Sequence, residues 1–178
     1  MHMKKLIVLL ASIVVLAIAA NARERGAESI VLMTSDDFQA GAMIPADVRF
    51  ISSGQPDEAA LRSIADAGFT VVVDFRSTNE DRGLDEQKVV EELGMIYATL
   101  PISGPSDITF DNAAALNQII AENEGRVFLH CSSGNRVAAL YALREKLLGA
   151  ANDDALAVGK VAGLTRFESI VRERLESE

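Results

Sequence analysis

The sequence predicts an α/β protein with a mainly parallel central sheet flanked by helices. Short apolar or β-branched runs alternate with longer segments whose apolar residues repeat at helical spacing, and glycine follows most of those segments. Strands that alternate with helices are joined by right-handed crossovers, which give a parallel sheet covered on both faces. The expected strands are 48–52, 70–75, 95–100 and 127–130.

Local signals define each element in order. After the first strand, the Ser-Gly-Gln-Pro turn at 53–56 leads to a helix that Asp57 caps and Gly68 ends. Three consecutive valines make 70–75 a buried strand, and two prolines with a glycine make 101–106 a loop. Either Thr109 or Asp111 caps the helix that runs to residue 124. The other expected helices are 85–93, 138–148, 152–162 and 166–176.

The first 22 residues have the pattern of a secretory signal peptide. Lys4 and Lys5 precede an apolar run at 6–20, and Ala20-Asn21-Ala22 is a small-residue cleavage pattern. We expect export to the periplasm or secretion of a chain that begins near Arg23. An uncleaved membrane anchor is the alternative, although this run is shorter than the roughly 20 residues that span a bilayer comfortably.

Residues 23–46 lack periodicity and are expected to form a loosely structured lead-in to one domain at 47–178. Removal of the signal takes away two lysines and no acid, so the formal charge changes from −9 to −11. This charge disfavours binding to nucleic acid and, once the signal is removed, stable association with anionic membranes. Because the histidines are only His2 and His130, and there is one cysteine, we expect neither a His/Cys metal cluster nor a cofactor.

Residues 130–136, His-Cys-Ser-Ser-Gly-Asn-Arg, are the strongest candidate site. They lie between a strand and a helix, where small residues and Gly134 allow backbone N–H groups to form a nest that binds anions. Arg136 adds a planar set of donors that suits oxyanions, and the same field favours a thiolate nucleophile at Cys131. The alternative is that Cys131 is a small buried apolar residue. We expect His130 to be structural, bonding backbone and ordering the loop.

The sequence resembles the beta-lactamase-hydrolase-like, protein-phosphatase-like domains, a branch of the dual-specificity phosphatase fold that is also labelled sulfurtransferase. The resemblance extends from about residue 49 to 175 and depends on three motifs. They are the Ser-Gly-Gln-Pro turn at 53–56, the run from Gly68-Phe69 through the valines to Asp74-Phe75-Arg76, and the loop at 130–136.

The resemblance implies that Cys131 is the nucleophile and that Arg136 holds the substrate oxyanion. A phosphatase also needs an acid that protonates the leaving oxygen. Asp107 on the preceding loop is the expected acid, with Asp111 in reserve unless it only caps a helix. The loop amides would line the substrate pocket; they belong to Ser132, Ser133, Gly134, Asn135 and Arg136.

Two departures from the phosphatase pattern leave three functions open. Four residues separate Cys131 from Arg136 where tyrosine and dual-specificity phosphatases have five, and Val137 replaces the usual hydroxyl residue. The first function is hydrolysis of a phosphate ester through a phosphocysteine, with a small anionic substrate or a phosphorylated protein as partner. The second is rhodanese-type sulfur transfer through a Cys131 persulfide, which the four-residue spacing favours. The third is a non-catalytic anion-binding module.

Overall fold

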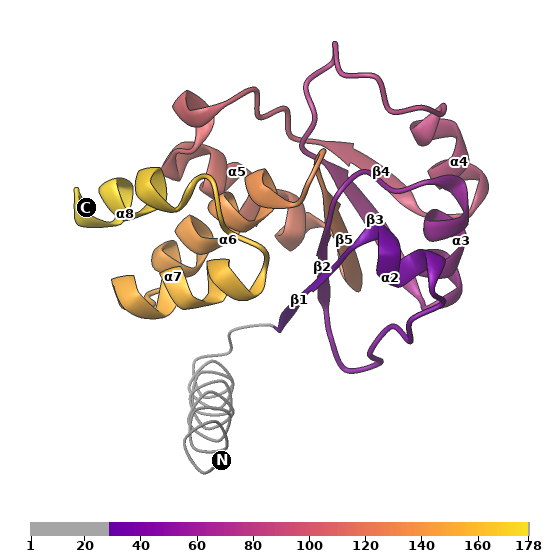
Figure 1. Ribbon diagram of the computed structural model, residues 1–178, viewed down its shortest axis with the longest axis horizontal. Coiled ribbons are helices and arrows are strands. Elements are labelled where there is room, and N and C mark those ends of the chain that lie inside the picture. Colours follow the sequence, from indigo (N-terminus) through magenta and orange to yellow (C-terminus); the bar gives the residue numbers. More distant parts are fainter. Residues whose placement is uncertain (1–28, 178) are drawn as a thin grey trace, which may run out of the picture.

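The computed structural model describes residues 29–177, which form a five-stranded parallel sheet between two layers of helices (Figure 1). The strands are β1 (Ile30–Met33), β2 (Phe50–Ser53), β3 (Phe69–Asp74), β4 (Ile96–Thr99) and β5 (Arg126–His130). The helices are α2 (Ser35–Gln39), α3 (Glu58–Asp66), α4 (Glu86–Glu92), α5 (Phe110–Glu122), α6 (Asn135–Leu147), α7 (Asn152–Val161) and α8 (Glu168–Glu176), with a short 3-10 turn η1 (Pro105–Asp107). The predicted α/β class and parallel sheet are therefore confirmed.

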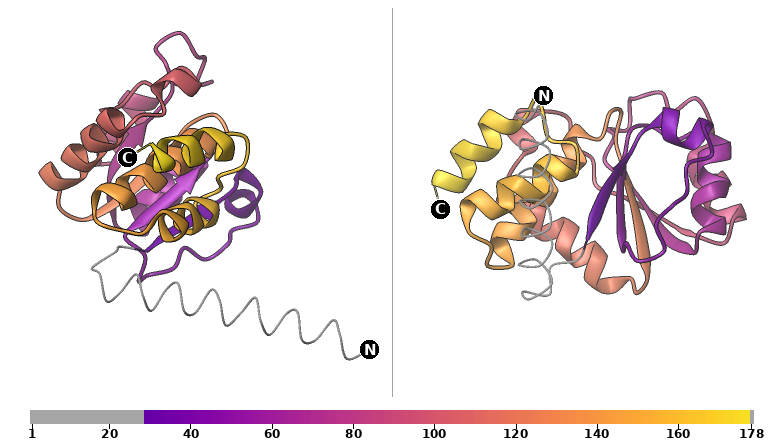
Figure 2. Two further views of the ribbon diagram at one scale, coloured as in Figure 1. Left: turned by 90° about the vertical axis from the view of Figure 1, so that its left-hand side faces the viewer. Right: turned by 60° about the horizontal axis from the view of Figure 1, so that its bottom comes forward.

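The two helical layers bury opposite faces of the strands. Helices α5 to α8 cover one face and α2 to α4 the other, as Figure 1 and the right-hand view of Figure 2 show. Phe50 and Ile51, which are adjacent in β2, point into different cores because successive strand residues face opposite sides of the sheet. Val73 and Val72 divide in the same way on β3. Both faces are apolar, so the strands form near-continuous hydrophobic runs in the sequence.

The strand order β1-β2-β5-β3-β4 places β5 in the centre of the sheet. His130, the last residue of β5, is in register with Ser53 at the end of β2 and with Asp74 at the end of β3. Three parallel strands therefore end at one place, and the chain continues from there into Cys131. Ligands of open α/β sheets bind outside this carboxyl edge.

The expectation of a loosely structured lead-in at 23–46 is wrong for half of its described part, residues 30–33 and 35–39. Ile30–Met33 pairs with β2 as an edge strand, and Thr34 begins α2 with a capping box that involves Asp37. The apolar run is only four residues long and has no partner nearby in the sequence, so periodicity could not reveal it. Residues 1–28 lie outside the described part, and the predicted signal peptide with them.

The start of one helix differs from the sequence prediction, and the start of another settles an alternative that the sequence left open. Helix α6 begins at Asn135, three residues before the expected start, because Gly134 adopts φ +79° and the chain turns directly into the helix. Thr109 is the N-cap of α5, and its hydroxyl accepts the Asn112 N–H, so Asp111 does not cap the helix. Within residues 29–177, no helix combines the length and apolar character needed to cross a membrane.

Candidate active site

Cys131 lies between the central strand and the first turn of α6. Its N–H donates to the Ser53 carbonyl at 3.3 Å, and Gly54 pairs with Ser133 in an isolated bridge. A Cβ on Gly54 would stand 3.2 Å from the Ser132 carbonyl oxygen, so this close approach favours glycine in the 53–56 turn. The Cys131 side chain is fully buried and packs in the apolar core. The loop is therefore short, fixed by β2, and closed over the sulfur in this structure.

Arg136 is the best-connected side chain of the loop. Its Nη1 donates to Glu80 Oε1 at 2.6 Å and to the Ile102 carbonyl at 2.8 Å. Its Nη2 donates to Glu80 Oε2 at 2.8 Å and to the Ser132 hydroxyl at 3.0 Å. The guanidinium thus connects the cysteine loop to the loops that follow β3 and β4.

The charges of this cluster shift two pKa values. The hydrogen bond from Arg136 is the largest cause that holds the pKa of Glu80 well below its usual range, although burial opposes it. The hydrogen bond to Glu80 in turn raises the pKa of Arg136, and a hydrogen bond and charge interaction with Cys131 add to that rise. Arg136 therefore stays charged beside the Cys131 thiol.

The other predicted loop residues divide by role. Ser132 and Ser133 are exposed, and their hydroxyls accept from Arg136 and Arg166 respectively. Gly134 supplies the left-handed backbone that starts α6. The Asn135 side chain is buried and turns away from the loop to bond residues 163–167, so only its backbone amide is left to face a substrate.

The predicted acid lies on a loop that reaches the site. The Ile102 carbonyl accepts from Arg136, and the next residue, Ser103, donates its N–H to Asp107 Oδ2 at 2.7 Å. The other oxygen of Asp107 accepts from the Ser106 hydroxyl at 3.2 Å. The carboxylate is thus held by its own loop in this structure. Asp111 is exposed in the first turn of α5.

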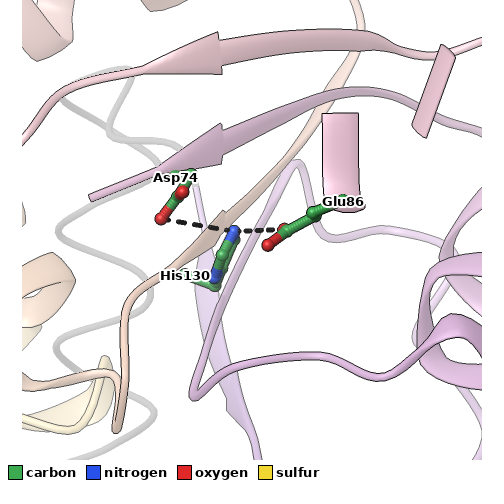
Figure 3. Close-up of side chains that lie close together, drawn as sticks. All are labelled: Asp74, Glu86 and His130. Atoms are coloured by element: carbon green, nitrogen blue, oxygen red, sulfur yellow. Dashed lines mark ion pairs between the residues drawn. The ribbon is translucent and has the colours of Figure 1, made fainter. Parts of the chain in front are cut away.

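His130 forms a buried cluster with two carboxylates, shown in Figure 3. Its Nε2 lies 2.6 Å from Glu86 Oε1 and 3.7 Å from Asp74 Oδ1, and all three side chains are almost completely buried. Although Nε2 and Oε1 are close, their geometry does not make a hydrogen bond, and neither atom has another hydrogen-bond partner among the described residues. The backbone bonds expected of His130 are not made within residues 29–177, because neither of its ring nitrogens has a hydrogen-bond partner there; the ring instead lies beside two carboxylates.

The same three residues offer ligand atoms close enough together to suggest a metal site. Two ligands of a tetrahedral zinc ion, each about 2.0–2.1 Å from it, would lie roughly 3.4 Å apart. Nε2 and Oε1 are much closer, at 2.6 Å. Asp74 Oδ2 is also already bound by Arg82 at 2.6 Å and by the Tyr97 hydroxyl at 2.8 Å. The arrangement fits an ion-pair network better than a metal centre.

Sequence reasoning missed three charged residues of the site: Glu80, Glu86 and Arg166. Glu80 lies in a polar loop directly after β3, at the same sheet edge as Cys131, and this position was the one available signal. Glu86 is in the first turn of α4 and Arg166 in the α7–α8 connection, where their sequence neighbours indicate ordinary surface residues. Only the fold brings them to the cysteine loop.

A parallel sheet whose central strand leads into a cysteine, a glycine and an arginine at a helix start defines the class of protein-phosphatase-like proteins with the dual-specificity and tyrosine phosphatase fold. Residues 28–165 match the family model described as DSP-PTPase phosphatase fused to NAD+ kinase. The match covers most of the chain, so this chain belongs to that family. The resemblance inferred from the sequence motifs is confirmed.

Two relatives of the same description agree with this assignment. A beta-lactamase hydrolase-like protein of Agrobacterium fabrum is 37% identical over 105 residues, which are 57% of this chain and 24% of that protein. A protein of the same description from Xylella fastidiosa is 32% identical over 126 residues, 68% of this chain and 29% of the relative. This chain therefore matches less than a third of the length of either relative.

The solved structures support the fold. A candidate phosphatase of Neisseria meningitidis superposes with a TM-score of 0.64 at 24% identity, over 76% of this chain and 97% of its own. A candidate phosphatase of Shewanella putrefaciens gives a TM-score of 0.52 at 21% identity, over 80% and 98% of the two chains. At these identities the likeness establishes the architecture, and the chemistry has to be argued from the residues.

Proposed function

We propose that this protein is a cysteine-dependent phosphatase that hydrolyses a phosphomonoester through a phosphocysteine at Cys131. The observation that carries the proposal is the placement of Arg136 in the first turn of α6, directly after the Cys131 loop, with its guanidinium fixed by Glu80 and the Ile102 carbonyl. A fixed guanidinium stabilises both a thiolate and the equatorial oxygens of a transferring phosphoryl group. The family and the fold agree with this chemistry.

The reaction has two steps. The Cys131 thiolate attacks phosphorus, the ester P–O bond breaks, and the leaving oxygen takes a proton from Asp107. Water then attacks the phosphocysteine and the P–S bond breaks. Inorganic phosphate is released and the thiolate is regenerated. Asp107, now deprotonated, accepts the proton of that water. Arg136 balances the charge of the phosphoryl oxygens in both steps.

The hydrogen bonds of Arg136 indicate which existing partner a bound phosphoryl group would replace. A guanidinium has five N–H donors, and those on its terminal nitrogens donate to Glu80, to the Ile102 and Phe75 carbonyls and to the Ser132 hydroxyl. Of these, the Ser132 hydroxyl is the neutral and exposed partner, whereas Glu80 is held through two charge-assisted bonds. A phosphoryl oxygen therefore takes the place of the Ser132 hydroxyl. Because the sulfur is fully covered, the loops after β3 and β4 must also separate from it.

The direct test measures phosphate release from an aryl phosphate. Cys131→Ser is expected to abolish release, and Asp107→Asn to lower kcat by about 10²- to 10⁴-fold, the usual contribution of a general acid. Asp111→Asn is the matched control and is expected to retain activity. Activity that survives Cys131→Ser contradicts the proposal, and a strong loss in Asp111→Asn with none in Asp107→Asn reassigns the acid.

Sulfur transfer is a second candidate because of the four-residue loop between Cys131 and Arg136. In that reaction the Cys131 thiolate attacks the outer sulfur of thiosulfate and releases sulfite, and cyanide then removes the sulfur from the persulfide as thiocyanate. The reaction needs no general acid, so thiocyanate formation should be indifferent to Asp107→Asn. Thiocyanate formed faster than phosphate, with this indifference, would favour the second candidate.

The substrate is proposed to be a small phosphate ester or a phosphorylated protein. The family description couples a phosphatase with NAD+ kinase in one chain. The kinase reaction makes a 2′-phosphomonoester, so NADP+ and adenosine 2′-phosphate belong in the first substrate panel beside phosphotyrosine peptides. We also propose export through residues 1–22, which the appearance of a mature chain beginning near Arg23 in the periplasmic fraction would test.

A further inference from the structure

A second arginine reaches the cysteine loop from the connection between α7 and α8. Arg166 Nη2 donates to the Ser133 hydroxyl at 3.1 Å, while Arg136 Nη2 donates to the adjacent Ser132 hydroxyl at 3.0 Å. Two guanidinium groups therefore contact successive hydroxyls of one loop. Arg136 comes from within the loop sequence, whereas Arg166 comes from 33 residues beyond Ser133.

The backbone that carries Arg166 is held in place by the loop itself. Asn135 Nδ2 donates to the Gly163 carbonyl at 3.2 Å, and Asn135 Oδ1 accepts the Phe167 N–H at 3.0 Å. Asn135 is only 3% exposed, so this clamp is protected from water. Because Asn135 is next to Arg136 in the chain, the position of Arg166 is tied to the position of the first guanidinium.

Arg166 differs from the neighbouring arginines in its charge balance. Arg136 and Arg76 both pair with Glu80, and Arg82 pairs with Asp74. Within the described part of the chain, Arg166 contacts the neutral Ser133 hydroxyl and pairs with no carboxylate. It is exposed, so a ligand at the loop can reach it. An acidic protein thus keeps an unneutralised guanidinium at the rim of its candidate site.

We infer that Arg166 is a second anion-binding residue and that the substrate is a phosphomonoester that carries a second phosphate or diphosphate group. The inference rests on the proposed function, because the first phosphate is the one held by Arg136. A guanidinium bonds a tetrahedral oxyanion through paired donors, and a phosphate offers more acceptor oxygens than the Ser133 hydroxyl does. The two arginines bond the hydroxyls of adjacent residues, whose Cα atoms lie about 3.8 Å apart, so one substrate can reach both guanidinium groups.

A binding series tests the second site without requiring turnover. Inorganic phosphate, diphosphate and triphosphate are titrated calorimetrically into the 178-residue chain and into Arg166→Ala, Arg166→Lys and Arg172→Ala. The wild-type protein is expected to bind triphosphate at least tenfold more tightly than phosphate. Arg166→Ala should remove most of that gain, and Arg166→Lys should keep part of it. Arg172 is a surface arginine on α8 paired with Glu168, so Arg172→Ala controls for the loss of one positive charge.

A kinetic pair then connects the site to the reaction. Adenosine 2′-phosphate and NADP+ have one phosphomonoester each, and only NADP+ adds a diphosphate. Arg166→Ala should lower kcat/KM at least tenfold for NADP+ and less than threefold for adenosine 2′-phosphate. Equal affinity losses for phosphate and triphosphate, or the same losses in Arg172→Ala, would overturn the inference. An Arg166-dependent binding gain in a protein that releases no phosphate from any ester would instead retain the anion site and reject the hydrolytic function.

Discussion

Glu80 holds both terminal nitrogens of Arg136, at 2.6 Å and 2.8 Å, from a loop 56 residues earlier in the chain. This pairing fixes the plane of the guanidinium while the carboxylate bonds no atom of the cysteine loop other than Arg136. Glu80 is therefore a positioning residue for the proposed reaction. Its contribution should appear in the orientation of Arg136 rather than in the chemistry of the substrate.

We predict that Glu80→Gln lowers kcat/KM by about tenfold, because the amide keeps one acceptor oxygen and turns a donor NH₂ towards the guanidinium, so one of the two bonds to Arg136 is lost. Glu80→Asp should recover part of the loss, since it keeps the charge with a shorter reach. Steady-state kinetics with an aryl phosphate measures both variants. Glu58→Gln is the control, because Glu58 pairs with Arg62 on the exposed surface of α3. An unchanged rate in Glu80→Gln would show that Arg136 does not need this partner.

The stability contributed by Glu80 should depend on pH. Its pKa is lowered in the folded protein, chiefly by the hydrogen bond from Arg136, so its contribution is fully present above the unfolded pKa of about 4.5. That contribution is lost as the pH falls below this value towards the folded pKa. Urea unfolding should therefore show wild type exceeding Glu80→Gln by about 1–2 kcal/mol at neutral pH, with a shrinking difference below about pH 4.5. A difference that grows on acidification contradicts the assignment.

Glu86 should stabilise the fold through His130. The Glu86 side chain is buried against His130 Nε2, and its other oxygen accepts from Gln55 at 2.8 Å. We predict that Glu86→Gln costs about 1–3 kcal/mol, because it removes the charge facing the ring and presents an amide donor. Glu91→Gln, on the exposed face of the same helix, should cost less than about 0.5 kcal/mol. Urea denaturation compares the two variants.

The same Glu86→Gln variant separates a purely structural role from a positioning one. His130 directly precedes Cys131, so a reoriented ring should slow alkylation of Cys131 by iodoacetamide at neutral pH. Inorganic phosphate should also protect the thiol less well than in wild type. If stability falls while the alkylation rate and its protection by phosphate stay unchanged, then Glu86 supports the fold alone.

Gly134 offers a test of the loop conformation. Its φ of +79° disfavours any residue with a Cβ, although an added Cβ would find its nearest atoms no closer than 3.5 Å. Gly134→Ala is predicted to lose about 1–2 kcal/mol of stability and most of the activity, since Gly134 is the N-cap of the helix whose first turn carries Arg136. Gly149→Ala has comparable backbone strain, at φ +93°, with no atom near its added Cβ. It should lose similar stability and keep its activity, as thermal unfolding and phosphate release would show.

The local parts of this architecture were accessible from the sequence. Valines at 71–73 identified β3, and Gly134 with Arg136 identified the loop, because these signals are confined to a few neighbouring residues. The edge strand Ile30–Met33 was missed, since four apolar residues outside any repeating pattern give no period to detect. The lead-in prediction consequently failed there.

The charge network could not be predicted in the same way. Glu80 and Glu86 meet Arg136 and His130 only because β3 and β5 are neighbours in the sheet. Hydrophobic periodicity reports which residues are buried, but it carries no information on which buried charge faces which. The roles of Asp107 and of the loop amides stay predictions, because they concern a bound substrate.

The central place of β5 has a consequence for how the chain folds. β2 and β3 flank β5 and do not pair with each other, so the β1–β2 and β3–β4 pairs remain separate until residues 126–130 are available. Two-stranded units of this kind have little stability alone. A ribosome must therefore deliver about three quarters of the polypeptide before a continuous sheet can assemble. The Cys131 thiol emerges one residue after the segment that completes the sheet, so the cysteine loop takes its place only in the last step of sheet closure.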